Sequence, residues 1–259
     1  TVYHLSEILE SRKDEEGVSL ITEQGILEGE VSLLPIQEWF FHEVELGEHF
    51  TSFHHWNQSF MIHVPELDID ILKQSLLQLV EKHDALRLYY PKTEHGYLQE
   101  YRKEAISPDL SILDRRDVSE EELVEVFTSW QSGFDITEGS LLHVGYIHGY
   151  EDGSCRVHFC FHHLIIDAVS WRILTEDLEL MYRSLKEGNT KPLYVKGSSY
   201  RQWVDVIKTY KEDSATSREE ELRYWNSIIE NTKNSSLHIQ SLSSSLYNHS
   251  DLVLDKDST

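Results

Sequence analysis

The residues best suited to chemistry are two adjacent histidines and an aspartate four residues later, His162, His163 and Asp167. An imidazole is the usual proton carrier near neutral pH, because its reference pKa is about 6.5. The same residues also have a structural interpretation, since histidines at a strand end often bond to the main chain and an aspartate before a helix often caps it. The residue types alone leave both interpretations open.

A predicted strand and a predicted helix position these three residues. The apolar stretch 155–163 predicts a strand, in which successive side chains point to opposite sides, so His162 and His163 cannot both enter one cavity. A helix is predicted to follow, with Asp167 at its N-cap and Ser170 three residues further on. The apolar stripe of this helix consists of Trp171, Leu174, Leu178, Met181 and Leu185.

The remaining chain alternates predicted helices and strands. Apolar residues at helical spacing predict helices over 35–46, 67–83, 120–130, 198–211 and 217–229. Shorter apolar runs predict strands over 59–64, 86–90, 97–101 and 141–148, the last joined to the strand at 155–163 by a turn at 151–153. This alternation predicts an α/β fold with a layered sheet.

The composition narrows the classes of partner. With 23 Lys and Arg against 46 Asp and Glu, the formal net charge is −23, so we expect no nucleic acid partner and no anionic membrane. No apolar run approaches the roughly 18 to 20 residues that span a bilayer, and the first residues lack the pattern of a signal peptide. These features predict a cytoplasmic protein.

The sequence does not predict a disulfide or a metal site. Cys155 and Cys160 are five residues apart, so on a strand they face opposite sides and are expected to be reduced core residues. His49, His54 and His55 are close in sequence but have no cysteine partner and no regular ligand spacing.

Several segments together resemble one protein family. His162-His163-x-x-x-Asp167 resembles the HHxxxD motif of the condensation and epimerization domains of nonribosomal peptide synthetases. The segments 35–40 (PIQEWF), 55–59 (HWNQS) and 169–174 (VSWRIL) are similar to the epimerization branch of that family, and 82–87 (KHDALR) is similar to its HxxLR region. Ala168 departs from the pattern, because the family usually has glycine there.

The resemblance implies a chloramphenicol acetyltransferase-like layered α/β lobe, one half of a two-lobe pseudo-dimer. It implies that His163 is the catalytic acid–base group in a tunnel, which a substrate on the 4′-phosphopantetheine of a carrier protein enters. It implies no bound cofactor and no metal. The opposite catalytic glutamate of the family lies in an EGHGRE-type motif that this chain does not contain, so the chain alone is expected to be inactive. The residues expected to support the site are His162, Asp167, Arg87, Ser170 and Trp171.

The resemblance also implies a domain order. Residues 1–12 resemble the last helix of an upstream carrier domain, although an ordinary N-terminal helix packing on the lobe is the alternative. A linker is expected over 13–30, the N-terminal lobe over 31–230, and the crossover into the second lobe over 231–259. The expected partners are a peptidyl carrier protein domain, neighbouring synthetase domains and the second lobe.

The expected function is epimerization of the Cα of an aminoacyl or peptidyl thioester. The alternatives are a condensation domain that forms peptide bonds and a non-catalytic lobe that docks carrier proteins. Within the site, we expect Asp167 to be buried and therefore to pair with Arg87, with a simple N-cap as the competing role.

Two further expectations concern the surroundings of the site. The N-terminal N–H groups of the helix near residue 168 are expected to stabilise an enolate modestly. Trp39, Phe40 and Phe41 are expected to lie in the core.

Overall fold

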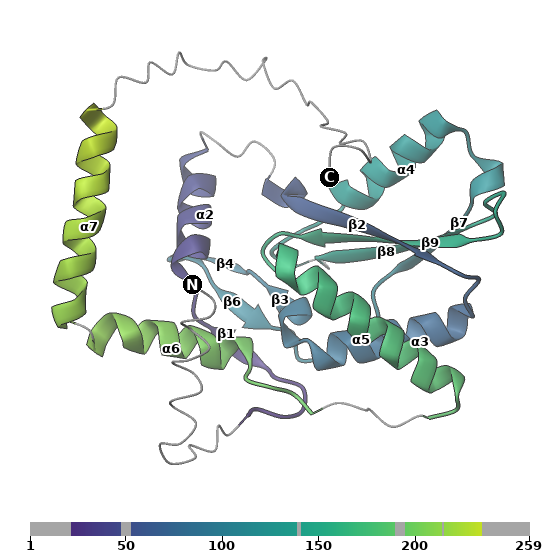
Figure 1. Ribbon diagram of the computed structural model, residues 1–259, viewed down its shortest axis with the longest axis horizontal. Helices are drawn as coiled ribbons and strands as arrows, with labels where there is room; N and C mark the ends of the chain where they lie inside the picture. The colour runs from purple at the N-terminus through teal and green to yellow at the C-terminus, as the bar shows by residue number, and fades with distance from the viewer. Residues whose placement is uncertain (1–21, 48–52, 139–140, 190–194, 214, 235–259) are drawn as a thin grey trace, which may run out of the picture. The chain divides into compact units, whose positions relative to one another are not determined.

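The computed structural model describes residues 22–47, 53–138, 141–189, 195–213 and 215–234 (Figure 1). The predicted carrier helix at 1–12, residues 13–21 of the predicted linker, and the crossover beyond residue 234 lie outside the described residues. The chain divides into two compact units, Thr1–Thr209 and Tyr210–Thr259. The first unit contains the sheets together with His162, His163 and Asp167.

The larger sheet has four strands in the order β2-β9-β8-β7 (Figure 1). Strands β2 (Asn57–Val64), β9 (Cys155–His162) and β8 (Leu142–His148) pair antiparallel, and β7 (Leu110–Asp114) pairs parallel with β8. The sequence did not predict β7, because this short edge strand has no clear apolar alternation.

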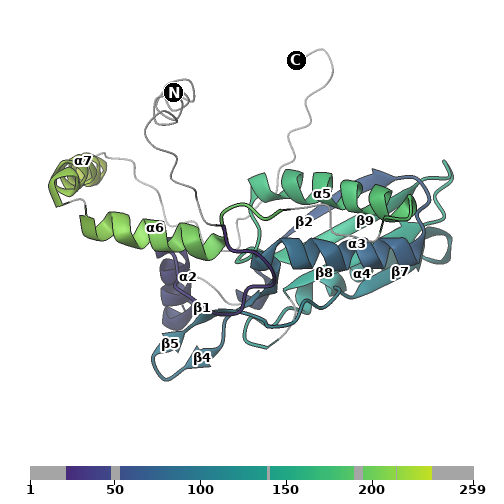
Figure 2. The same ribbon diagram turned by 90° about the horizontal axis from the view of Figure 1, so that it is seen from below.

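Helices cover the two faces of this sheet according to strand parity. Helices α3 (Ile69–Lys82) and α5 (Ala168–Lys186) lie side by side on one face (Figures 1 and 2). On that face the ring of Phe161 contacts Trp171 of α5. The opposite face carries His158, whose ring contacts Trp130 of α4 (Glu120–Ser132). The alternation of side chains along β9 thus separates the two layers of helices.

A smaller sheet supports a different helix. Its order is β1-β6-β3, formed by Gly29–Val31, Gln99–Tyr101 and Leu88–Tyr89. Helix α2 (Pro35–Leu46) packs near it, where Phe41 stacks on Tyr97 with ring centroids 4.5 Å apart. Tyr97 belongs to the adjacent hairpin of β4 (Lys92–Thr93) and β5 (Gly96–Tyr97).

Short 3₁₀ helices connect these elements: η1 (Phe53–His55), η2 (Asp84–Arg87) and η3 (Arg115–Asp117). The strand predicted over 86–90 is therefore partly wrong, because its first residues belong to η2.

Local capping signals place the starts of three helices. Asp68 accepts from the amides of Asp70 and Ile71 at the start of α3, and Ser119 forms a capping box with Glu122 at the start of α4. Asp167 caps α5 in the same way. The predicted helices 67–83 and 120–130 therefore differ from the observed ones by only a few residues.

The last two helices of the described residues are α6 (Tyr200–Asp213) and α7 (Ala215–Asn234). Within the first unit, α6 is anchored by the fully buried Val204 and by an ion pair between Arg201 and Glu23. Taken by itself, α7 is longer than the predicted helix at 217–229.

Two further sequence expectations concern the state of the cysteines and membrane-spanning segments. Cys155 and Cys160 are both free and buried, as predicted. Among the described helices, none is both long and apolar enough to cross a membrane.

Candidate functional site

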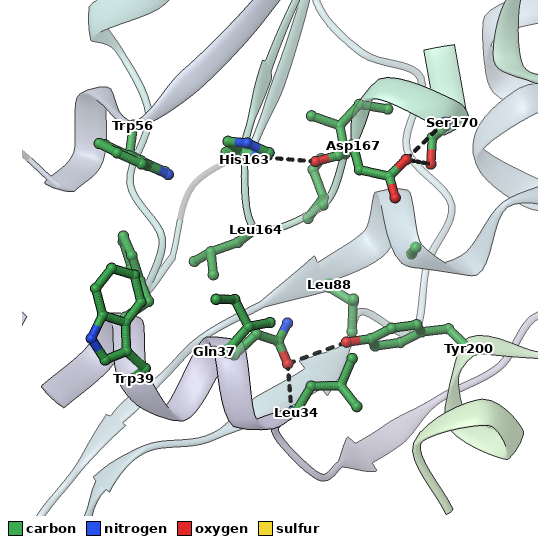
Figure 3. A pocket seen from close by; sticks show the side chains of 15 residues that line it. Leu34, Gln37, Trp39, Trp56, Leu88, His163, Leu164, Asp167, Ser170 and Tyr200 are labelled. Atoms are coloured by element: carbon green, nitrogen blue, oxygen red, sulfur yellow. Dashed lines mark hydrogen bonds between the residues drawn. The ribbon is translucent and has the colours of Figure 1, made fainter. Parts of the chain in front are cut away.

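A cavity of about 400 Å³ lies beside the turn that joins β9 to α5 (Figure 3). Most of its lining is apolar and comes from α2, from residues 164–166, and from Trp56 and Leu88. The polar side chains in the lining are those of Gln37, His163, Asp167, Ser170 and Tyr200.

His162 points into the protein and is fully buried. Its Nε2–H donates to the carbonyl oxygen of Phe53 at 2.8 Å, while its Nδ1 accepts from the amide of Leu164 at 3.2 Å. Both ring nitrogens are thus satisfied by the main chain in the neutral form. Burial lowers the pKa of His162 to about 4, so the ring stays neutral near pH 7.

His163 points to the other side and is exposed at the cavity (Figure 3). Its Nδ1–H donates to the carbonyl oxygen of Ile166 at 2.8 Å, and its own amide donates to the Trp56 carbonyl at 2.8 Å. The ring also stacks on Trp56, with centroids 6.4 Å apart and 17° between the planes. The predicted separation of the two histidines is confirmed, and Nε2 is the nitrogen of His163 that does not bond to the main chain.

Gln58 of β2 is a polar neighbour of His163 that sequence reasoning missed. Its Nε2 lies 3.1 Å from Nε2 of His163, and its Oε1 accepts from Nε1 of Trp171 at 3.0 Å. Gln58 pairs with Phe161 across the two strands, so His163 is its diagonal neighbour on the same face. The only sequence signal for this residue was its place in the 55–59 segment.

Asp167 is exposed and caps α5, so the predicted pair with Arg87 is wrong. Its Oδ1 accepts from the hydroxyl of Ser170 at 2.6 Å and from the Ser170 amide at 2.8 Å. The bond from the Ser170 hydroxyl is the main cause that holds the pKa of the Asp167 carboxyl below its ordinary value, and the bond from the Ser170 amide adds to it. The amide of Ser170 at the start of α5 is therefore already engaged, which weakens the expectation that this helix end stabilises an enolate.

Arg87 is buried away from the cavity lining. Its guanidinium pairs with Asp84 in the same 3₁₀ turn and donates to the carbonyl of Leu27 at 2.8 Å. Lys196 also reaches Asp84, at 2.8 Å. Arg87 thus connects η2 to the segment around Leu27. The buried carboxylate that needs a cation is Asp84 rather than the exposed Asp167.

Gln37 organises the side of the cavity opposite His163 (Figure 3). Its Oε1 accepts from the amide of Leu34 at 2.9 Å and from the hydroxyl of Tyr200 at 3.2 Å. Its Nε2 donates to Gln99 at 2.8 Å. The PIQEWF segment contained this residue, but nothing local in the sequence indicated a buried amide network.

The aromatic residues of α2 divide between core and cavity. Phe40 and Phe41 are buried, as predicted, whereas Trp39 is 51% exposed and lines the cavity. The prediction of a core position for Trp39 is therefore wrong, because three consecutive residues cannot all face one side of a helix.

The described residues contain no cluster of three or more His, Cys, Asp or Glu side chains that could hold a metal ion. His54, for which the sequence predicted no metal, has its Nδ1 3.4 Å from the amide nitrogen of Ile136.

A family model described as "Condensation domain" matches residues 27–251 of this chain. N-(5-amino-5-carboxypentanoyl)-L-cysteinyl-D-valine synthase of Penicillium rubens is 38% identical over 215 residues, which are 83% of this chain and 5% of that protein. Tyrocidine synthase 2 of Brevibacillus parabrevis is 33% identical over 221 residues, which are 83% of this chain and 6% of that protein. The chain thus spans a small part of the length of these relatives.

Two solved structures are similar in fold. The epimerization domain from the third module of tyrocidine synthetase B matches with a TM-score of 0.70 and 30% identity, over 83% of this chain and 47% of that one. The starter condensation domain of rhizomide synthetase matches with a TM-score of 0.62 and 17% identity, over 77% of this chain and 48% of that one. The chain spans about half of each, and the fold class predicted from the resemblance is confirmed.

Proposed function

Because this chain belongs to the condensation domain family of nonribosomal peptide synthetases, we propose that it inverts the Cα of an amino acid held as a thioester. The observation that carries the proposal is the position of the His163 ring at an apolar cavity, with Nδ1 held by the Ile166 carbonyl. This geometry leaves Nε2 for proton transfer.

The reaction begins when Nε2 of His163 takes the proton from Cα. The electron pair of the broken C–H bond moves into the thioester enolate, and a proton delivered to the opposite face then gives the inverted configuration. Apolar walls favour the reaction because they exclude water, which would compete for both protons.

The second acid–base group must stand on the other face of the enolate. Besides His163, the titratable side chains in the described cavity lining are Asp167 and Tyr200, and both are engaged in hydrogen bonds with neighbours. We propose that a second lobe, outside the described residues, supplies this group and closes the cavity into a tunnel.

The substrate is proposed to arrive on the 4′-phosphopantetheine of a peptidyl carrier protein. In this proposal the domain binds no cofactor of its own and works in the cytoplasm beside other synthetase domains. A tethered thioester suits the cavity, because the arm can enter along an apolar wall while the reacting carbon reaches His163.

Two observations favour epimerization over condensation. The similar epimerization domain is 30% identical to this chain, whereas the similar starter condensation domain is 17% identical. The name of the Penicillium relative includes a D-valine, the product expected when an L-valine residue is inverted.

Condensation is the second candidate function, because the matching family model is described by that activity. The two reactions use the same histidine position but differ in the bond that changes. Epimerization breaks and reforms a C–H bond, while condensation joins two carrier-bound substrates through an amide.

The test incubates the full protein containing this chain with a carrier-bound L-aminoacyl or L-peptidyl thioester in D₂O. Epimerization predicts deuterium at Cα and a mixture of D and L forms without any second substrate. Amide formation with a second carrier-bound substrate, and no deuterium at Cα, would establish the condensation alternative instead.

A further inference from the structure

A three-residue relay connects α5 to His163 through β2. The indole Nε1 of Trp171 lies 3.0 Å from Oε1 of Gln58, and Nε2 of Gln58 lies 3.1 Å from Nε2 of His163. Trp171 is buried, Gln58 is half-buried and His163 is exposed, so the relay runs from the interior of the protein to the cavity.

The chemistry of the groups determines every hydrogen in this relay. An indole N–H can only donate, so the amide oxygen of Gln58 must face Trp171 and its NH₂ must face His163. The Ile166 carbonyl can only accept, so Nδ1 of His163 carries a proton. The remaining contact joins the Gln58 NH₂ to Nε2 of His163, and it is a hydrogen bond only when Nε2 presents its lone pair.

From this geometry we propose that Gln58 is a positioning residue that holds His163 in its neutral, proton-accepting form. A protonated ring would direct Nε2–H at the Gln58 NH₂, and Gln58 cannot turn its oxygen to that proton without losing the bond from Trp171. The inference rests on the proposed function, since it describes how the same histidine is kept ready to remove the Cα proton.

The relay also favours the later loss of the proton from His163. The Gln58 NH₂ moves off Nε2 when the substrate Cα–H arrives, and the proton passes to Nε2 while the C–H electron pair enters the enolate. The Gln58 NH₂ returns when the substrate leaves, and it then opposes the positive charge of the protonated ring. Gln58 therefore favours release of the proton, which returns His163 to the form that begins the next cycle.

Other titratable groups near His163 act equally in the wild type and in variants of Gln58. Asp167 at the cap of α5 and His162 on β9 both interact electrostatically with His163. Tyr200 lines the same cavity from α6, and His54 of η1 interacts with His162. A difference between variants of Gln58 thus reports on the relay alone.

The first experiment follows the titration of His163 by NMR in the 259-residue chain labelled with ¹⁵N-histidine. The His163 signals are identified by their loss in His163→Ala. In Gln58→Glu a carboxylate faces Nε2, so the midpoint of protonation should rise by about 1 to 3 pH units. In Gln58→Leu the rise should be smaller, because the opposing NH₂ is lost without gain of an acceptor.

A second variant separates the relay from simple contact with Gln58. Trp171→Phe removes the indole N–H, which frees the Gln58 amide to present its oxygen to a protonated ring, so the midpoint should rise. The same change in the Gln58→Leu background should have no effect. Gln74→Leu on the exposed face of α3 is the matched control and should leave the titration unchanged. Equal midpoints in wild type, Gln58→Glu and Trp171→Phe, with unaltered thermal unfolding, would overturn the inference.

Deuterium exchange at Cα in the full protein then connects the relay to catalysis. Gln58→Glu should slow exchange at pH 7 by about tenfold for each pH unit by which its midpoint exceeds 7, with recovery at higher pH. If wild type shows no exchange but the midpoints differ as expected, the proposed function fails and the relay stands. If wild type exchanges and the midpoints are equal, only the relay fails.

Discussion

His162 and His163 are adjacent residues whose side chains lie on opposite sides of the end of β9, and they differ in burial and in hydrogen bonding. His162 is sealed in the interior and carries its proton on Nε2, toward the Phe53 carbonyl. His163 faces the cavity and carries its proton on Nδ1, toward the Ile166 carbonyl. Two identical side chains therefore have opposite tautomers, because each is set by the carbonyl that it meets.

The difference separates a histidine with a structural role from one that is placed to act as proposed. Both nitrogens of His162 bond to main-chain atoms, which cannot move without disturbing η1 or the turn after β9. The Nε2 of His163 meets the side chain of Gln58, which can be displaced by a substrate. Substitutions at the two histidines and at the helix cap beside them test this difference.

The largest effect is expected for His163→Ala in the full protein. Loss of a general acid–base group should reduce exchange of the substrate Cα proton by about 10²- to 10⁴-fold. Folding should be retained, because the side chain is exposed and its removal leaves no cavity. Deuterium incorporation measures the exchange, and thermal unfolding measures the retained stability. An unchanged exchange rate in His163→Ala together with lost exchange in His162→Ala would mean that the two histidines are assigned backwards.

The next effect concerns pH and the buried ring. The pKa of His162 is about 4 in the folded protein, below the reference value of about 6.5 expected for the unfolded chain. Between these values the unfolded chain binds more protons, so the stabilising contribution is complete above about pH 6.5 and is lost as the pH falls toward 4. The loss should reach roughly 3 kcal/mol from this one residue.

Urea unfolding at pH 7 and pH 4.5 measures this loss. His162→Gln is the matched variant, because its amide keeps a donor and an acceptor but does not titrate. The pH dependence of its unfolding free energy should be clearly smaller than in the wild type. An identical pH dependence in His162→Gln and wild type would mean that another group causes the acid sensitivity. One such group is His158, because burial also lowers its pKa to about 4.

A smaller effect is expected for His162→Ala at neutral pH. The change leaves the Phe53 carbonyl and the Leu164 amide without their partner, which should lower the free energy of unfolding by about 1 to 3 kcal/mol. Chemical denaturation measures it. Exchange at Cα should persist in the folded fraction, and loss of exchange in a stably folded variant would make His162 more than a structural residue.

The smallest effect is expected at the cap of α5. Asp167→Ala should destabilise the protein by about 0.5 to 2 kcal/mol, since Ser170 loses its capping acceptor. Asp167→Asn keeps an oxygen at that position and should cost less. If both variants were destabilised by more than Arg87→Met, which breaks a buried ion pair, Asp167 would have a role beyond capping.

Much of the fold follows from local patterns in the sequence. Helix α2 was predicted with its observed bounds, Pro35–Leu46, because proline marks its first turn. In the structure Gly47 ends this helix with a φ of 68°. Strands β1 and β7 were missed, because such short segments become strands only when a neighbouring strand supplies their hydrogen bonds. Their sequences alone do not contain that information.

The candidate site shows the same division between local and distant contacts. Period-two alternation predicted that His162 and His163 face opposite sides. Spacing offered the N-cap of the following helix as one role of Asp167, but the sequence prediction preferred the pair with Arg87, and the structure shows the cap. Tertiary structure alone decided that Lys196 and the Leu27 carbonyl join the local Asp84–Arg87 pair, that Trp39 lines the cavity, and that Gln58 reaches His163 from 105 residues away. Local rules act over a few residues of chain, whereas these contacts depend on how distant segments come together in three dimensions.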